Sequence, residues 1–81
     1  MLITVRFSAG LIQHTGQARL PVTLAEGATV ADLRQHLAQH FEDAQPLLAN
    51  AVPVLAGRHV TDSEPLQNGQ EVSLLLPIAG G

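Results

Sequence analysis

In the middle of the chain, residues 29–41 read TVADLRQHLAQHF. Apolar side chains recur there at spacings of three and four, with polar side chains between them, a pattern typical of a helix with one buried face. The apolar positions are Val30, Leu33, Leu37 and Phe41. Thr29 can cap the first turn, and Asp32 completes a capping box with a shorter acid than usual. We therefore predict a helix that begins at Val30 and ends near Asp43.

Two alternating stretches precede this helix and predict a pair of strands. Apolar side chains fall at every second position in residues 2–8, and residues 18–24 repeat the pattern. Pro21 has no N–H to donate, so the second strand should lie at an edge of the sheet or turn that position away from a partner. Residues 9–17 contain two glycines and several polar side chains, and we expect a wide connecting loop there.

The chain after the helix predicts three further strands. A short turn is expected at residues 47–50, followed by a third strand over residues 52–57 and a short return strand over residues 58–60. The pair Asn68–Gly69 favours the positive φ angles of a tight turn, from which a last strand should start. The buried side of that strand should carry Val72, Leu74 and Leu76.

These elements follow the order β-β-α-β-β-β, which fits a mixed sheet with its first and last strands in the middle. A helical connection is long enough to bring two strands together in parallel, and its apolar face would cover one face of the sheet. We predict an α+β fold of the ubiquitin-like β-grasp type, with four to five strands and one main helix on one face. Residues 1–81 would form this single domain, and its carboxyl end would leave the middle of the sheet.

Composition restricts what such a domain can do. The 81 residues are 46% hydrophobic and 14% charged, which fits a globular chain with room for one core. The net charge is -3, with four arginines and no lysine, which disfavours nucleic acid and favours a protein partner. The apolar stretch at residues 47–57 is too short for a membrane helix. The amino terminus lacks the charge order of a secretory signal, so we expect a cytoplasmic protein that contacts no membrane.

Residues that carry out enzyme chemistry are scarce. Cysteine is absent, which excludes disulfides, thiolate catalysis by this chain and zinc sites built on sulfur. His36 and His40 stand four residues apart on the predicted helix, but two imidazoles do not complete a metal site, and a solvated helix face is the simpler interpretation. The glycines form no phosphate-binding loop, and the serines match no nucleophile motif. We predict no metal site, no cofactor bound by this chain and no independent enzyme activity.

The chain's last residues, 77–81, read PIAGG. An extended segment of this length reaches about 17 Å. Gly80 and Gly81 have no side chains, so the Gly81 carboxylate could pass through a narrow channel into another protein's active site. Small residues also occur at chain ends without a function. The place of this pair directly after the last strand of a β-grasp domain favours a functional, flexible tail over residues 77–81.

Several segments resemble the MoaD/ThiS family of sulfur carriers, and the likeness covers essentially the whole chain. The segments are Phe7–Gly10, Thr29–Gln35, Pro65–Val72 and Leu76–Gly81. The wide first connection, residues 9–17, is similar to that of the MoaD branch, the small subunit of molybdopterin synthase, and we place the chain nearest to it. The ending IAGG is similar to thiamine carriers, so a role in making thiamine thiazole or another sulfur-containing metabolite stays open.

The resemblance implies a two-step activation of Gly81. A ubiquitin-activating-type adenylyltransferase would use MgATP to form an acyl adenylate there, and a sulfur donor protein would replace AMP to leave a thiocarboxylate. Gly80, which has no side chain, would let the tail pass through a narrow channel to the partner's active site. In the MoaD branch the loaded tail would enter the large subunit of molybdopterin synthase and pass its sulfur to a pterin precursor of the molybdenum cofactor. The chain would be a sulfur-donating subunit with no catalytic groups of its own.

A partner must also dock on the body of the domain. Leu75 falls opposite the buried side of the last strand and should face outward, and Ile78 would extend this apolar track onto the tail. We expect Leu75 and Ile78, with Pro77 and Ala79, to contact the partners. Two other functions remain open. One is a protein modifier that transfers Gly81 to amines of other proteins, and the other is a passive β-grasp interaction module.

Overall fold

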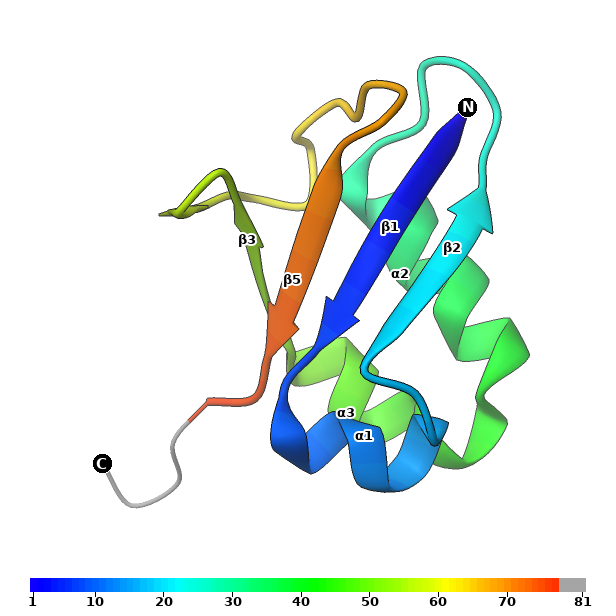
Figure 1. Cartoon of the computed structure of the whole chain (residues 1–81), viewed down its shortest axis with the longest axis vertical. Coiled ribbons are helices and arrows are strands. Elements are labelled where there is room, and N and C mark those ends of the chain that lie inside the picture. The colour runs from blue at the N-terminus through cyan, green and yellow to red at the C-terminus, as the bar shows by residue number, and fades with distance from the viewer. Residues whose placement is uncertain (78–81) are drawn as a thin grey trace.

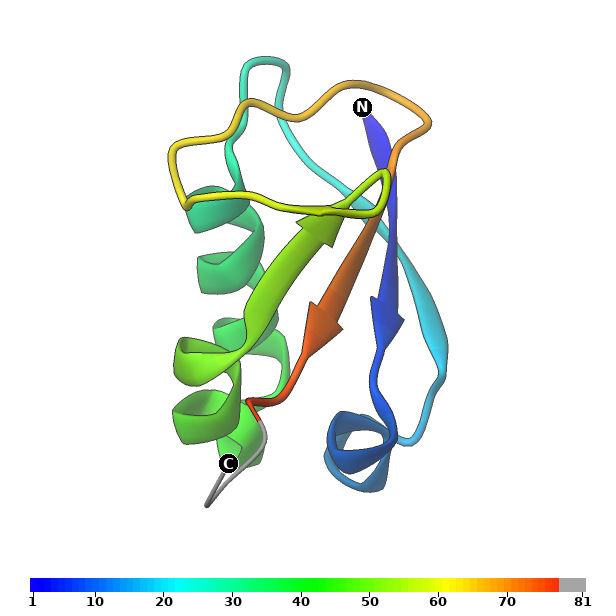
Figure 2. The ribbon, with the colours of Figure 1, turned by 90° about the vertical axis from the view of Figure 1, so that its left-hand side faces the viewer.

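The computed structural model describes residues 1–77 and contains a five-stranded mixed sheet with helices packed on one of its faces and a further short helix beyond the end of its first strand (Figures 1 and 2). The strands are β1 Leu2–Phe7, β2 Arg19–Thr23, β3 Val52–Leu55, β4 Arg58–His59 and β5 Glu71–Leu75. The helices are α1 Ala9–Thr15, α2 Val30–His40, the 3-10 helix η1 Glu42–Ala44 and α3 Gln45–Asn50. The order across the sheet is β2-β1-β5-β3-β4. This is the predicted β-grasp arrangement, with the first and last strands in the centre.

The two central strands, β1 and β5, run parallel, and each has an antiparallel neighbour on its other side. Val5 is the register partner of Val72 across the parallel pair. Such a pair needs a long crossover, which the chain between β2 and β5 supplies. Pro21 lies opposite Thr4 in the edge strand β2. Its expected edge position is thereby confirmed, since an edge strand leaves one side of its backbone without a ladder.

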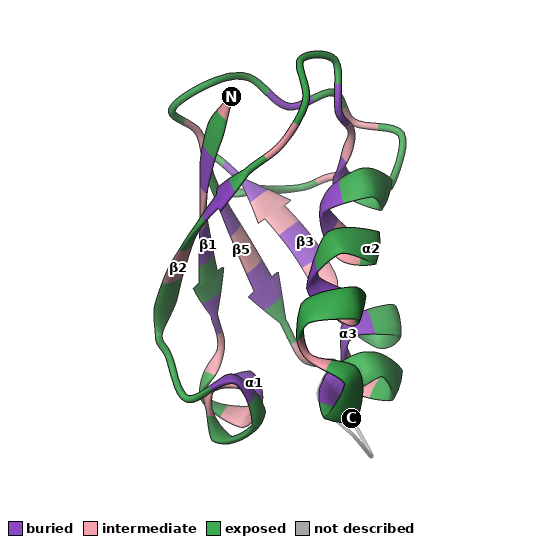
Figure 3. Ribbon diagram, turned by 90° about the vertical axis from the view of Figure 1, so that its right-hand side faces the viewer, coloured by how far each residue is buried: buried purple, intermediate pink, exposed green. Residues whose placement is uncertain are grey.

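Helix α2 lies over the inner face of the sheet, with its buried residues turned toward the strands (Figure 3). The backbone N–H of Thr29 donates to Oδ2 of Asp32 at 2.8 Å, and that of Asp32 donates to Oγ1 of Thr29 at 3.4 Å. This is the predicted capping box. The helix ends at His40, before the predicted end at Asp43, because the chain turns there into η1 and buries Ala44.

The hydrophobic core fills the space between the inner sheet face and the helices. Its largest members come from the central strands and from each α-helix: Ile3, Val5, Phe7, Leu11, Leu33, Leu37, Leu48, Val72 and Leu74. Leu76, predicted to be buried with Val72 and Leu74, is half-buried at the edge of this core. The reason is that β5 ends at Leu75, so Leu76 is no longer held in the ladder.

The prediction of a loop between the first two strands is wrong, because residues Ala9–Thr15 form helix α1. Leu11 and Thr15, four residues apart, are both buried on one helix face. Gly16 follows with φ 74°, and its N–H donates to the carbonyl of Ile12, as in a left-handed helix cap. Gly16 therefore marks the end of a helix rather than a loop.

The turn predicted at residues 47–50 is also helical and belongs to α3. Pro46 stands in the first turn of α3, where a missing N–H loses no intrahelical hydrogen bond. Leu48 of the same helix is completely buried. Pro46 thus starts a second helix instead of only ending the first, and that helix adds to the cover of the inner face.

Candidate functional site

The chain leaves the sheet at the end of β5, close to the junction of β1 and α1 (Figure 1). Because β1 and β5 are parallel, both strands finish on the same side of the molecule. We call residues 7–9 and 75–77 the exit end. Pro77, predicted to contact partners, is exposed there and is the last residue described. The other tail residues with predicted roles lie outside the described residues, and these are Ile78, Ala79, Gly80 and Gly81.

Leu75 lies on the sheet face opposite the helices, as the alternation of β5 predicts, and is 40% exposed. The pairing of β3 with β5 sets Val52 opposite Leu75 and Val54 opposite Ser73, and residues paired in this way share a face of the sheet. Both valines are half-buried. We call Val52, Val54 and Leu75 the outer patch, an apolar surface beside the exit end.

Sequence reasoning identified Leu75 but missed the two valines of the outer patch. Strand β3 buries Pro53 and Leu55 against the core, which turns Val52 and Val54 outward. The period of two was present in the sequence. It was hidden because every side chain of this strand is apolar, so the two faces could not be told apart by polarity.

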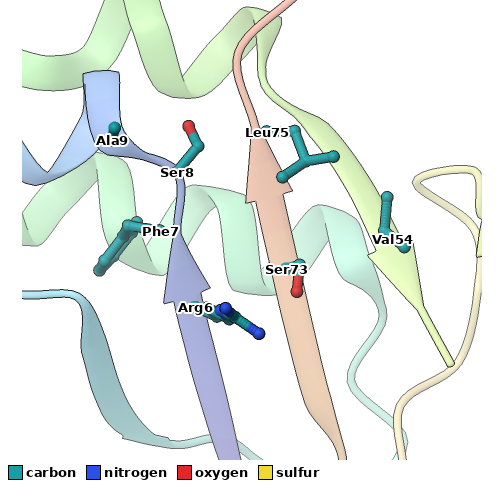
Figure 4. A pocket seen from close by; sticks show the side chains of 7 residues that line it. All are labelled: Arg6, Phe7, Ser8, Ala9, Val54, Ser73 and Leu75. Atoms are coloured by element: carbon teal, nitrogen blue, oxygen red, sulfur yellow. The ribbon is translucent and has the colours of Figure 1, made fainter. Parts of the chain in front are cut away.

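An open hollow of about 370 Å³ lies next to the outer patch (Figure 4). Its lining comes from the ends of β1, β3 and β5 and from the start of α1, namely Arg6, Phe7, Ser8, Ala9, Val54, Ser73 and Leu75. Ligand sites for small molecules are usually enclosed clefts. The openness of this hollow suits a side chain projecting from a partner protein better than an enclosed substrate.

Two arginines lie side by side near this hollow. Arg6 in β1 is the register partner of Arg19 in β2, and both are exposed. Within residues 1–77 the ion pairs join Arg34 to Asp62 and Arg58 to Glu64, so neither Arg6 nor Arg19 is paired there. Like charges directly opposite each other are unfavourable in a sheet. Although the whole chain has a net negative charge, Arg6 and Arg19 therefore offer positive charge to an acidic partner.

The described residues contain little that could bind a metal or carry out a reaction. His36 and His40 stack on the exposed side of α2 with ring centroids 6.4 Å apart. Within residues 1–77 no group of three histidine or acidic side chains is placed to hold a metal ion. In the same part of the chain, no helix has the length and apolar character needed to cross a bilayer. The exit end and the outer patch are therefore the features on which a function can be argued.

Comparison with protein families gives a match over nearly the whole chain. The model of the ThiS family matches residues 5–81, which include the exit end, all of β5 and the tail. The chain belongs to the ThiS family. The predicted membership in the MoaD/ThiS sulfur carriers is thereby confirmed. No curated protein matches the chain.

Solved structures of other ubiquitin-like proteins share the fold of this family member. A putative molybdopterin converting factor subunit 1 from Pyrococcus furiosus is 24% identical, with a TM-score of 0.87 over 96% of this chain and 99% of that chain. Small archaeal modifier protein 1 from Haloferax volcanii is 19% identical, with a TM-score of 0.84 over 95% and 98%. A complex of subunits 1 and 2 of molybdopterin-converting factor from Helicobacter pylori gives 22% identity and a TM-score of 0.72 over all of both chains.

Proposed function

We propose that this chain carries sulfur as a thiocarboxylate at Gly81 and donates it, as the small subunit of a molybdopterin synthase, in molybdenum cofactor biosynthesis. The observation that supports this most is the position of the exit end. The chain leaves from the central strand β5 beside the outer patch, in which Leu75 is exposed, and beside an open hollow. A partner docked on the outer patch would have its active site within reach of a tail that ends in Gly80 and Gly81.

The proposed chemistry takes place at the Gly81 carboxylate. A carboxylate is a poor electrophile because its oxygen is a poor leaving group, and activation is needed before a nucleophile can replace it. An adenylyltransferase with MgATP would release pyrophosphate and make AMP the leaving group. The terminal sulfur of a donor protein's persulfide would then displace AMP from the carbonyl carbon, and a thiol would reduce the remaining S–S bond to release the thiocarboxylate. The chain contains no cysteine, so no thiol of its own competes for the activated carbonyl. Gly80 would leave room for the walls of a narrow channel.

The outer patch is the proposed docking surface for the adenylyltransferase and for a large synthase subunit. The Helicobacter pylori structure joins subunits 1 and 2 of molybdopterin-converting factor, and we infer a corresponding large subunit for this chain. Leu75 would contact these partners from the body, and Pro77, Ile78 and Ala79 from the tail. The exposed Arg6 and Arg19 would face acidic residues of a partner.

A second candidate function is that of a protein modifier. The fold likeness to small archaeal modifier protein 1 favours it, and the same activated Gly81 could be transferred to an amine of another protein. A thiamine thiazole carrier would also use the same tail, and the ending IAGG favours that pathway. A passive interaction module would use the outer patch without any reaction at Gly81.

Intact mass measurement distinguishes these functions. The purified full chain is incubated with a ubiquitin-activating-type adenylyltransferase, MgATP, a persulfide-bearing donor and a thiol reductant that cleaves the resulting acyl disulfide, and we expect the mass gain of one oxygen replaced by sulfur. Adding a large synthase subunit and its pterin precursor should return the carboxylate and form the dithiolene. Branched adducts would instead support the modifier, and an unmodified chain the passive module.

Deletion of Gly81 is the matched control for that measurement. The truncated chain should keep the circular dichroism and melting temperature of the full chain, because the core lies within residues 1–77. It should gain no sulfur at all. Sulfur loading of the truncated chain would show that Gly81 is not the reacting residue.

A further inference from the structure

Ser8 connects the start of α1 to the last residues of β5. Its carbonyl accepts the N–H groups of Leu11 and Ile12 at 2.9 and 3.0 Å, and its own N–H donates to the carbonyl of Leu74 at 3.0 Å. In addition, the N–H of Leu76 donates to Oγ of Ser8 at 3.3 Å. One residue thus holds both the first turn of a helix and the backbone of Leu76, which lies past the end of the ladder.

Gly10 makes room for the side chain of Leu76. A β-carbon at Gly10 would lie 2.6 Å from Cδ1 of Leu76 and 3.7 Å from its Cγ, and the first distance is too short for real atoms. Any other residue at position 10 would therefore push the end of the Leu76 side chain out of its present place. The two residues are far apart in sequence, and this contact joins α1 to the base of the tail.

The backbone gives no other reason for a glycine at position 10. The described glycines Gly16, Gly27, Gly57 and Gly69 all adopt positive φ, where glycine is favoured, and added β-carbons there would meet nothing within 4 Å. Gly10 is not among the residues with positive φ, and it lies inside α1, where glycine is less favourable than alanine. Glycine lowers the stability of α1 at this position, and the room that it leaves for Leu76 is the structural reason for its presence.

We infer that Ser8 and Gly10 are positioning residues, which fix Leu76 and thereby set the direction in which the tail leaves the body. The inference rests on the proposed reaction at Gly81. If a partner's channel held residues 77–81 extended, they would span about 17 Å, and a change of about 20° at Leu76 would then move the far end by about 6 Å relative to the docked body. A displacement much smaller than this slows reactions that need a near-attack geometry. The residues act through Leu76 and do not touch the reacting atoms.

The first experiment needs no partner and measures hydrogen exchange at the Leu76 amide in the full chain. Ser8→Ala removes the acceptor, and we expect exchange at Leu76 to become faster by about ten-fold, the effect of one lost hydrogen bond. Gly10→Ala should act in the same direction by pushing the Leu76 side chain away. Exchange at Val72, which is buried in the ladder, should stay the same. Unchanged exchange at Leu76 in both variants would overturn the inference.

The second experiment measures pyrophosphate release from MgATP by the adenylyltransferase with each variant as substrate. Gly10→Ala should lower kcat by about ten-fold and leave KM within a factor of about two, because a misdirected tail affects the reaction more than the docking. Its melting temperature should change little, because the gain in helix propensity from alanine offsets the weakened packing of Leu76. Gln13→Val, a change at an exposed position of the same helix, should leave both kcat and KM at their wild-type values.

Gly10→Val combined with Leu76→Ala tests whether the contact itself matters. The larger side chain at position 10 can occupy the space of the one removed at position 76, so the loss in kcat of the double variant should be smaller than the product of the two single losses. Losses that multiply would overturn the inference, as would a Gly10→Ala chain with the kcat of the wild type. A wild-type chain that is never adenylated would instead reject the proposed function, and the inference with it.

Discussion

Leu74 and Leu75 are neighbours in β5, and the same side chain has a different environment at each position. Leu74 is 1% exposed and faces the helices, whereas Leu75 is 40% exposed and faces outward beside Val54. Strand geometry alone sends consecutive side chains to opposite faces. One face of the sheet therefore stabilises the domain, and the other remains available for a partner.

The difference between the two faces continues across the central strands. The inner face holds Phe7, whose ring meets that of Phe41 edge-on with centroids 6.0 Å apart. The outer face of the same strand holds Arg6, with Arg19 as its neighbour in β2. Substitutions on the inner face should lower the free energy of unfolding without changing how the folded molecules bind a partner. Substitutions on the outer face should weaken partner binding and leave the free energy of unfolding nearly unchanged.

The largest effect on folding is expected from Leu74→Ala, with Leu75→Ala as its matched control. Truncating a fully buried leucine lowers the free energy of unfolding by about 2–5 kcal/mol, a large fraction of the stability of so small a domain. An exposed leucine should contribute less than about 0.5 kcal/mol. Urea unfolding followed by circular dichroism measures both. Equal losses in the two variants would show that the two faces do not differ as the structure indicates.

When binding is measured instead of stability, Leu75→Ala should have a larger effect than Leu74→Ala. Leu75→Ala should raise the KM for the adenylyltransferase by about ten-fold, the cost of losing an interface contact worth more than about 1 kcal/mol. A Leu75→Ala chain with wild-type KM would remove the outer patch from the docking surface. The comparison with Gly10→Ala then separates docking from tail direction, because the first change acts on KM and the second on kcat.

The next effect concerns Arg34, which holds the helical layer together. Its Nη1 donates to the carbonyls of Leu48 and of Ala51, the latter at 2.9 Å, and its Nη2 donates to Oδ1 of Asp62 at 2.8 Å. These bonds join α2 to the end of α3 and to the loop before β5. Arg34→Ala should lower the free energy of unfolding by about 2–3 kcal/mol, because partly buried carbonyls lose a charged donor.

Asp62→Asn is the control for Arg34. The Asp62 side chain is 54% exposed, and an exposed ion pair contributes only about 0–1 kcal/mol. Thermal or urea unfolding of the two variants should therefore differ clearly, with the arginine change the more damaging. A larger loss for Asp62→Asn would place the importance of Arg34 in the ion pair and not in its bonds to the backbone.

The central strands and α2 were predictable from the sequence because their signals are local. The alternation in residues 2–8 and the capping box at Thr29 each specify one element without help from the rest of the chain. Helices α1 and α3 are short and contain Gly10 and Pro46, which act against a helix when considered by composition alone. Tertiary burial of Leu11 and Leu48 overrides that tendency.

The candidate site likewise contains residues that could be predicted from local sequence signals and residues that could not. Leu75 could be predicted because the alternation of a single strand decides its face. The valines of the outer patch and the contact of Gly10 with Leu76 could not, because they depend on the pairing of β3 with β5 and on the packing of α1 against residues far along the chain. Arg34 lies on the polar side of α2, where its bonds to α3 left no local signal.

The smallest effect is expected from the two adjacent arginines of the outer face. Arg6→Gln removes a like-charge contact with Arg19, so the free energy of unfolding should rise slightly, by about 0.2–1 kcal/mol. Binding to the adenylyltransferase should weaken at low salt and differ less from the wild type at high salt, because exposed charges are screened. Arg58→Gln is the control, since Arg58 is paired with Glu64 in the described structure and does not line the hollow. If Arg6→Gln lowers the free energy of unfolding and leaves the salt dependence of binding unchanged, the two arginines stabilise the fold and do not contribute to partner binding. The difference between the two faces of the sheet would then hold for apolar side chains but not for charged ones.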